Sequence, residues 1–137
     1  AEAAAALTIP VVANGDIADT NRAKAVLNFT KAQAVMIGRA ALGRPWIFKE
    51  IKEELRTGKP YEVSRGEKVR AILAHWQWHM QSYPEPVCVM TFRKHLLWYL
   101  AGWPDFESVR GALCQARDAA GQLSILKDYF NRHGWIV

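Results

Sequence analysis

Two short, uninterrupted apolar runs near the start of the chain constrain the fold more than any other feature. They occupy residues 9–13 and 34–37, and about twenty residues separate them, including a helical pattern over 19–29. Apolar strands without polar alternation are typical of a parallel sheet that is covered on both faces. Asp19, Thr20 and Asn21 offer helix N-cap side chains before the intervening helix. The pattern therefore predicts a βαβ unit.

Two parallel strands leave both sheet edges and much apolar surface exposed, so this unit is not expected to stand alone. The sequence therefore predicts an α/β fold in which further strands complete the sheet. Each apolar run ends at a glycine-bearing turn. In a (β/α)8 barrel, such turns after the last two strands form the usual phosphate site.

The periodicity becomes helical after Gly58. Ser64 and Glu67 match a capping box, and apolar residues at helical spacing follow over residues 69–80. Further stripes or start and stop signals predict three more helices, one over 89–100, one after Asp105, and one ending before His133. Short connections favour an all-α helical bundle. We therefore expect a barrel portion over residues 1–57 and a helical domain over 58–137.

Composition agrees with a soluble globular chain. Of the 137 residues, 50% are hydrophobic and 23% are charged, and no segment is apolar enough for a membrane span or a secretory signal. Cys88 and Cys114 are far apart, which favours two reduced thiols and a cytoplasmic location. The net charge of +5 permits an anionic partner without requiring one.

The turns after the two apolar runs carry candidate ligand-binding residues. Asn14, Gly15 and Asp16 follow the first run, and Gly38 and Arg39 follow the second. Backbone N–H groups at the carboxyl ends of parallel strands attract anions, and a guanidinium suits a phosphate. Taken alone, the first turn is better explained as an ordinary strand-to-helix connection, and the second fits either interpretation. Together, the two turns favour a phosphate site at one edge of the sheet.

Three segments resemble a known family in this order and spacing. Residues 9–17 (IPVVANGDI), 34–48 (AVMIGRAALGRPWIF) and 93–100 (RKHLLWYL) look like the carboxyl-terminal part of bacterial tRNA-dihydrouridine synthases, type B. The resemblance covers nearly the whole chain, and the stretch over 38–48 is its most specific piece. It implies the last two strands of an FMN-binding TIM (β/α)8 barrel followed by a helical tRNA-binding domain.

The resemblance also implies an activity. Enzymes of this family use NADPH to reduce bound FMN and then reduce uridine in tRNA to 5,6-dihydrouridine. Carried over by position, Asn14, Gly15 and Asp16 match the family's first FMN-binding stretch, and Gly38 with Arg39 match the second. Arg39 is thereby expected to neutralise the flavin phosphate.

The family's catalytic cysteine has no counterpart here. It lies on a loop of the middle of the barrel, which is expected upstream of residue 1, and neither Cys88 nor Cys114 matches its position. The chain thus looks like an inactive carboxyl-terminal fragment of an enzyme that is monomeric at full length. Exposed barrel strands predict that such a fragment self-associates in isolation.

The predicted helix over 89–100 carries a candidate RNA-binding face. With Phe92 and Leu96 inward, Lys94 and Trp98 fall on the opposite face, His95 lies beside them, and Arg93 lies on the other flank. A cation next to an exposed aromatic ring suits a phosphate and an unpaired base. The alternative is a solvated Lys94 and a Trp98 that packs against a neighbouring helix.

Other assignments stay open. His75 and His79 are spaced as metal ligands on one helix face, but no third ligand accompanies them, so no metal site is predicted. A nonenzymatic helical RNA-binding or docking module is the alternative function. A different phosphate-binding flavin barrel would share the two glycine turns, but the helical second half argues against it.

Overall fold

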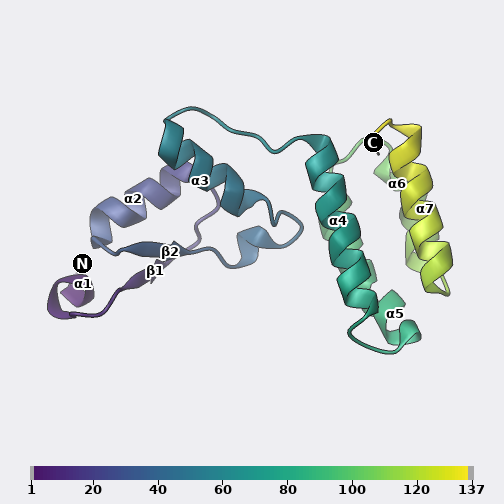
Figure 1. Ribbon diagram of the computed structural model, residues 1–137, viewed down its shortest axis with the longest axis horizontal. Coiled ribbons are helices and arrows are strands. Elements are labelled where there is room, and N and C mark those ends of the chain that lie inside the picture. The colour runs from purple at the N-terminus through teal and green to yellow at the C-terminus, as the bar shows by residue number, and fades with distance from the viewer. Residues whose placement is uncertain (1, 136–137) are drawn as a thin grey trace. The chain divides into compact units, whose positions relative to one another are not determined.

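The computed structural model describes residues 2–135 and divides the chain into two compact units, which meet in sequence between Val63 and Ser64. The first unit contains a two-stranded parallel sheet, and the second is helical (Figure 1). The protein is therefore an α/β chain in which helix predominates. Each unit is described by itself below.

The first unit contains the predicted βαβ arrangement. Strands β1 (Val12–Asn14) and β2 (Ala34–Met36) pair in parallel, and helix α2 (Thr20–Thr30) connects them. Asp19 caps α2, because its carboxylate accepts a hydrogen bond from the Arg22 N–H. The remaining elements are α1 (Glu2–Ala6), the 3-10 helix η1 (Arg39–Ala41) and α3 (Ile47–Thr57).

The strands are shorter than the apolar runs that predicted them. The first run begins at residue 9, but the pairing starts only where Val11 and Gln33 exchange hydrogen bonds, through the Gln33 backbone N–H and its side-chain oxygen. Lys31, in the left-handed region at the end of α2, leaves only two residues before β2 begins. Ile9 thus has no partner strand and is 65% exposed.

Helices cover one face of the sheet. Val35 packs against a core of Ile17, Ala23, Ile47 and Ile51. Figure 1 shows α2 and α3 on the same side of the two strands.

The strand residues that alternate with Ala13 and Val35 lie on the opposite face of the sheet. Val12 is 57% exposed and Met36 is 49% exposed. Among the residues that the structure describes, one face of the two strands is covered and the other is exposed.

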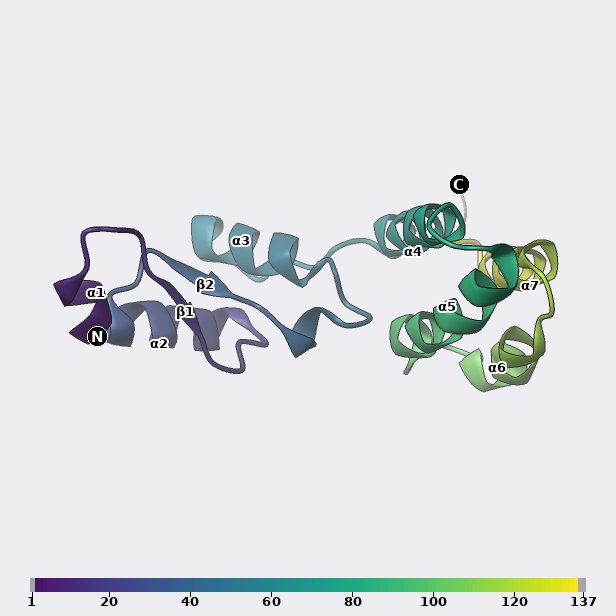
Figure 2. The same cartoon turned by 90° about the horizontal axis from the view of Figure 1, so that it is seen from below.

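Over its described residues, 64–135, the second unit contains four helices, α4 (Arg65–Met80), α5 (Glu85–Leu100), α6 (Phe106–Gln115) and α7 (Ala119–Arg132), which Figure 2 shows from below. The apolar side chains on the inward faces of these helices form the core, and Ile72, Phe92, Leu113 and Leu126 are each at most 1% exposed. The predicted start and stop signals for all four helices are confirmed within a few residues.

A buried glutamine side chain joins three of these helices. The Gln122 side chain on α7 accepts a hydrogen bond from the Trp76 indole N–H on α4, at 3.0 Å, and donates one to the Val89 carbonyl on α5, at 3.2 Å. Gln122 is fully buried, and an amide with these partners avoids the cost of an unpaired polar group.

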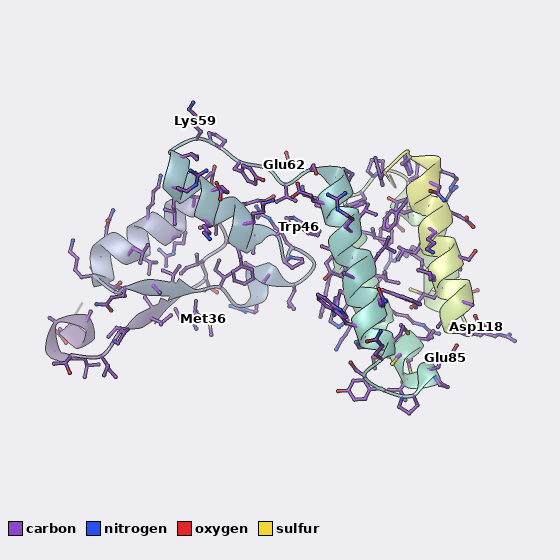
Figure 3. All side chains as sticks on the ribbon, in the orientation of Figure 1. Met36, Trp46, Lys59, Glu62, Glu85 and Asp118 are labelled. Atoms are coloured by element: carbon purple, nitrogen blue, oxygen red, sulfur yellow. The ribbon has the colours of Figure 1, made fainter. Side chains whose placement is uncertain are left out.

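Polar caps fix the helix ends. The Ser64 and Glu67 capping box is confirmed. Asp118 caps α7, and the nearby Glu85 carboxylate at the start of α5 accepts a hydrogen bond from the Ala119 N–H, at 2.8 Å (Figure 3). These contacts join the start of α5 to the start of α7.

Within residues 2–135, no helix combines the length and the apolar character that crossing a membrane requires.

The capping box predicts a measurable stability effect. Ser64→Ala removes the hydroxyl that accepts from the Glu67 N–H, so we expect the free energy of unfolding of the second unit to fall by about 1 kcal/mol. Urea unfolding followed by circular dichroism would measure it. Ser124→Ala is the matched control, because Ser124 is exposed within α7 and alanine favours helix. Equal destabilisation by both changes would contradict the role of the cap.

Candidate functional site

The two glycine turns meet at one edge of the sheet. Because β1 and β2 are parallel neighbours, the residues that follow them lie at the same end. Asn14, Gly15, Asp16, Gly38 and Arg39 all line one open pocket of about 420 Å³. The structure thus brings together every residue that the sequence proposed for a phosphate site.

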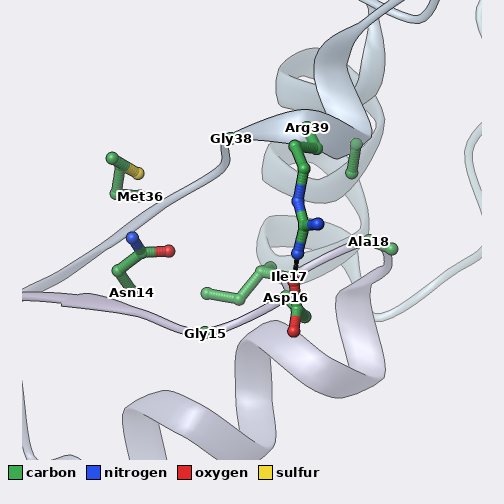
Figure 4. Close-up of a pocket in the computed structure, with 9 residues that line it drawn as sticks. Asn14, Gly15, Asp16, Ile17, Ala18, Met36, Gly38 and Arg39 are labelled. Atoms are coloured by element: carbon green, nitrogen blue, oxygen red, sulfur yellow. Dashed lines mark hydrogen bonds and ion pairs between the residues drawn. The ribbon is translucent and has the colours of Figure 1, made fainter.

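An ion pair spans the two turns. Arg39 Nη2 lies 2.7 Å from Asp16 Oδ1, and the two side chains are 86% and 82% exposed (Figure 4). Such exposed pairs contribute at most about 1 kcal/mol, so Arg39 can engage a ligand at little cost. Asp16 itself adopts the left-handed region, with φ of 46°. The Asp16 carboxylate on the first turn thus points toward Arg39 on the second turn.

The two glycines border open space. A Cβ atom built at Gly15 or at Gly38 would meet no other atom within 4 Å, and neither glycine has a positive φ. Packing within the described residues therefore does not require glycine at either position. A ligand that approaches the backbone closely would explain both.

A buried carboxylate, that of Glu50, binds segments of the chain next to this pocket. Glu50 on α3 is 5% exposed, and its Oε2 accepts two hydrogen bonds from Arg44, from Nε at 3.1 Å and from Nη2 at 2.7 Å. Its Oε1 accepts from the Val63 N–H. Arg44 also reaches the carbonyl oxygen of Ala18 in the first turn, at 3.4 Å.

Sequence reasoning missed this arrangement. Arg44 follows Gly43 at the end of the second turn segment, and Glu50 lies six residues later, which is not a spacing that predicts a helical ion pair. Through Arg44, the segment after η1 is fixed both to α3 and to the first turn.

The second predicted site lies on α5. Lys94 and Trp98 are exposed, and His95 is half-buried with its ring centroid 5.4 Å from that of Trp98. Arg93 differs from these three. Its Nη2 donates to the Ala116 carbonyl at 2.9 Å, and its Nε is buried, so its guanidinium joins α5 to the connection between α6 and α7.

Three histidines form a cluster between α4 and α5. The His75 and His95 ring centroids are 4.9 Å apart, and the His79 ring centroid lies 6.1 Å from His75 and 5.9 Å from His95. His75 Nδ1 is hydrogen-bonded to the Tyr99 hydroxyl at 2.9 Å. His79 Nε2 is hydrogen-bonded to Thr91 Oγ1 at 2.8 Å.

The surroundings of His75 and His95 favour their neutral imidazole forms. Burial, followed by the neighbouring charges of His75, Lys94 and His79, lowers the pKa of His95 to about 4. Burial and then His79 lower the pKa of His75. The spacing of His75 and His79 does not predict this cluster, because His95 joins the pair only through the packing of α4 against α5.

Candidate metal ligands and the two cysteines were the remaining features of the sequence to place in the structure. No group of three or more His, Cys, Asp or Glu side chains there is arranged to hold a metal ion. Cys88 is buried, with Sγ 3.0 Å from the His79 carbonyl oxygen, and Cys114 is half-buried. Both cysteines are free thiols and belong to the second unit, whereas the pocket residues belong to the first.

Comparison with known proteins identifies similar sequences. The model of the dihydrouridine synthase family matches residues 1–133. A tRNA-dihydrouridine synthase B from Xanthomonas axonopodis pv. citri (strain 306) is 43% identical over 132 residues, which are 96% of this chain and 40% of that protein.

Two further relatives carry the same name. The protein from Serratia marcescens is 41% identical over 125 residues, covering 90% of this chain and 37% of its own length. The protein from Escherichia coli (strain K12) is 42% identical over 125 residues, covering 90% of this chain and 39% of its own length. The chain thus spans about 40% of the length of the curated relatives it matches.

The Glu50 arrangement predicts a local stability effect. Glu50→Gln keeps the shape but removes the charge that Arg44 contacts, so we expect the first unit to lose about 2 kcal/mol. Amide hydrogen exchange of residues 47–57, measured by mass spectrometry, should accelerate. Glu53→Gln is the matched control on the same helix, because Glu53 pairs with the largely exposed Arg56. If both changes accelerate exchange equally, the buried pair does not hold the unit.

The histidine cluster predicts loss of stability in acid. The folded chain holds the pKa of His95 near 4, below its ordinary value of 6.5, so the unfolded chain binds more protons between these values. The stabilisation is complete above about pH 6.5 and is lost as the pH falls toward about 4. We expect the melting temperature of the second unit to fall by about 5 °C or more over this range. A His95→Gln variant should show a smaller fall, and an equal fall would contradict this origin.

Proposed function

Because the chain belongs to the dihydrouridine synthase family, we propose that it is the carboxyl-terminal part of an enzyme that reduces uridine to 5,6-dihydrouridine in tRNA. The enzyme uses bound FMN and takes its reducing equivalents from NADPH. The observation that carries this proposal is the pocket in which two parallel-strand turns bring Arg39, Asp16 and Asn14 together. The names of the three relatives support the substrate.

The sheet supports a place within a larger barrel. Helices lie on one face of β1 and β2, while Val12 and Met36 on the other face are exposed. In a TIM barrel, helices cover the outside and strand residues of this kind fill the interior. We infer that further strands of the same enzyme complete a (β/α)8 barrel, in which residues 1–57 supply the last two strands.

The residues at the pocket fit a flavin mononucleotide. Arg39 has donors to spare for a phosphate beyond the one that contacts Asp16, because a guanidinium carries five N–H groups. Asp16 and Asn14 offer acceptors to the hydroxyl groups of a ribityl chain, and the open space at Gly15 and Gly38 allows close approach to the backbone. A ligand that combines an anion with hydroxyl donors suits this mixed set better than a bare phosphate.

Bound FMN supplies hydride transfer, and the residues of this chain bind and orient it. Arg39 fixes the phosphate end, and Arg44 with Glu50 holds the turn segments in place. Among the described residues, Asp16 is the one carboxyl group that lines this pocket, it is paired with Arg39, and no cysteine lines the pocket. The acid is therefore assigned to the longer enzyme outside residues 1–137, and this chain by itself is inactive.

The helical unit is the proposed tRNA-binding part. Lys94, His95 and Trp98 present a cation beside aromatic rings on α5. Arg93 is left out of this surface because its guanidinium is bound to the Ala116 carbonyl. We place the full-length enzyme in the cytoplasm as a monomer.

The alternative function, a nonenzymatic RNA-binding or docking module, draws on one observation. The four helices of the second unit have their own buried core, which a separate binding module requires. It leaves the pocket of the first unit without a role.

Loss of Arg39 tests the flavin site. We expect the full-length protein to copurify with FMN and its Arg39→Ala variant to bind FMN about tenfold or more weakly, because a charge-assisted hydrogen bond is lost. Titration of the apoprotein with FMN, followed by flavin fluorescence, measures the affinity. Arg56→Ala is the matched control, because Arg56 is exposed on α3 and pairs with Glu53. Unchanged flavin affinity in the Arg39 variant would overturn the site assignment.

A further inference from the structure

We propose that the outer flank of α4 and α5 binds unpaired bases of single-stranded RNA by stacking them on Trp78 and Trp98. This inference rests on the proposed function, and it names the part of an RNA that the helical unit recognises. We call this surface the two-tryptophan face and define it by Trp78, Lys94, His95 and Trp98. Trp78 was not among the residues that the sequence pattern selected.

The two indole rings lie on the same side of the helix pair. The histidine cluster marks the seam between α4 and α5, because His75 and His79 on α4 both contact His95 on α5. Helical spacing turns Trp78 by about 60° from His75, away from the buried Ile72. The same spacing turns Trp98 by about 60° from His95, away from the buried Leu96. Both rings therefore flank the seam on its solvent side.

Exposure distinguishes these two tryptophans from the others in the unit. Trp78 is 68% exposed and Trp98 is 41% exposed. Trp76 donates its N–H to Gln122, while the Trp103 and Trp135 rings contact each other and Arg65. Those three have roles inside the unit. Two large exposed rings flanking one seam are unusual on a surface that binds nothing.

The charge of the helix pair favours an anionic partner. Over residues 68–104, Glu85 is the single acidic residue, against the four basic residues Lys68, Arg70, Arg93 and Lys94. The Glu85 carboxylate is itself engaged with the Ala119 N–H. The net charge of this stretch is therefore +3, and Lys94 adds an exposed cation one helical turn from Trp98.

Stacking combined with positive charge selects single-stranded nucleic acid. The rings of Trp78 and Trp98 can cover the faces of bases only where those bases are not already stacked in a duplex. Trp98 is held by its edge-to-face contact with His95, so that ordering it on binding costs little entropy. Lys94 is placed to contact the phosphate backbone beside the stacked base.

The test uses the full 137-residue chain and three fluorescently labelled probes. The first probe is a single-stranded RNA of about 12 nucleotides and mixed sequence, the second is the same strand annealed to its complement, and the third is a tRNA transcript. Fluorescence anisotropy gives each affinity over a range of salt concentrations. Circular dichroism verifies that each variant is folded.

We expect Trp78→Ala and Trp98→Ala each to weaken binding of the single strand about fivefold or more, with an unchanged salt dependence. Trp78→Phe and Trp98→Phe should each retain part of the affinity, because phenylalanine keeps an aromatic ring. Lys94→Ala should instead reduce the salt dependence. Gln77→Ala is the matched control, because Gln77 is exposed beside Trp78, and its affinity should equal that of the parent chain.

Several results would overturn the inference. If both alanine variants bind tRNA and the single strand normally, the two-tryptophan face does not bind RNA, and the proposed function stands. Equal binding of duplex and single strand would exclude recognition of unpaired bases. Displacement of the RNA by an acidic peptide at equal charge concentration would indicate a general polyanion surface. If the parent chain binds none of the three probes, the RNA-binding part of the proposed function fails as well.

Discussion

Parallel pairing of β1 with β2 is the constraint on which the candidate site depends. Parallel neighbours end at the same edge of a sheet, so the turns that carry Asp16 and Arg39 come together although 22 residues separate them in sequence. An antiparallel pair would place these turns at opposite ends. The pairing also requires the crossover helix α2, whose packing with α3 buries Ala23 and Ile51 and thereby holds the strands from one side.

The sequence predicted those elements whose signals are local. The Ser64 and Glu67 capping box, the cap at Asp19 and the apolar stripes of the later helices all depend on residues within a few turns, and the structure has each of them. Strand length was less predictable, because a strand ends where its partner ends. The apolar character of residues 9 and 10 therefore did not make them part of the sheet.

The candidate site likewise combines residues with a local sequence signal and contacts without one. Asn14, Gly15, Asp16, Gly38 and Arg39 were found because a glycine turn after an apolar strand is visible in sequence. The contacts of Arg44 with Glu50 and Ala18, and those of His95 with the two histidines of α4, join residues whose spacing carries no such signal. Arg93 shows the reverse case, since a cation beside Lys94 in sequence is bound to a carbonyl group on another segment.

The uneven distribution of tryptophan gives each unit its own optical signal. Trp46 is the single tryptophan before residue 64, whereas the other five, including both rings of the two-tryptophan face, belong to the helical unit. The near-ultraviolet circular dichroism signal thus reports mainly on the second, helical unit. The far-ultraviolet signal averages over both units, so the two probes would follow different transitions wherever the units unfold independently.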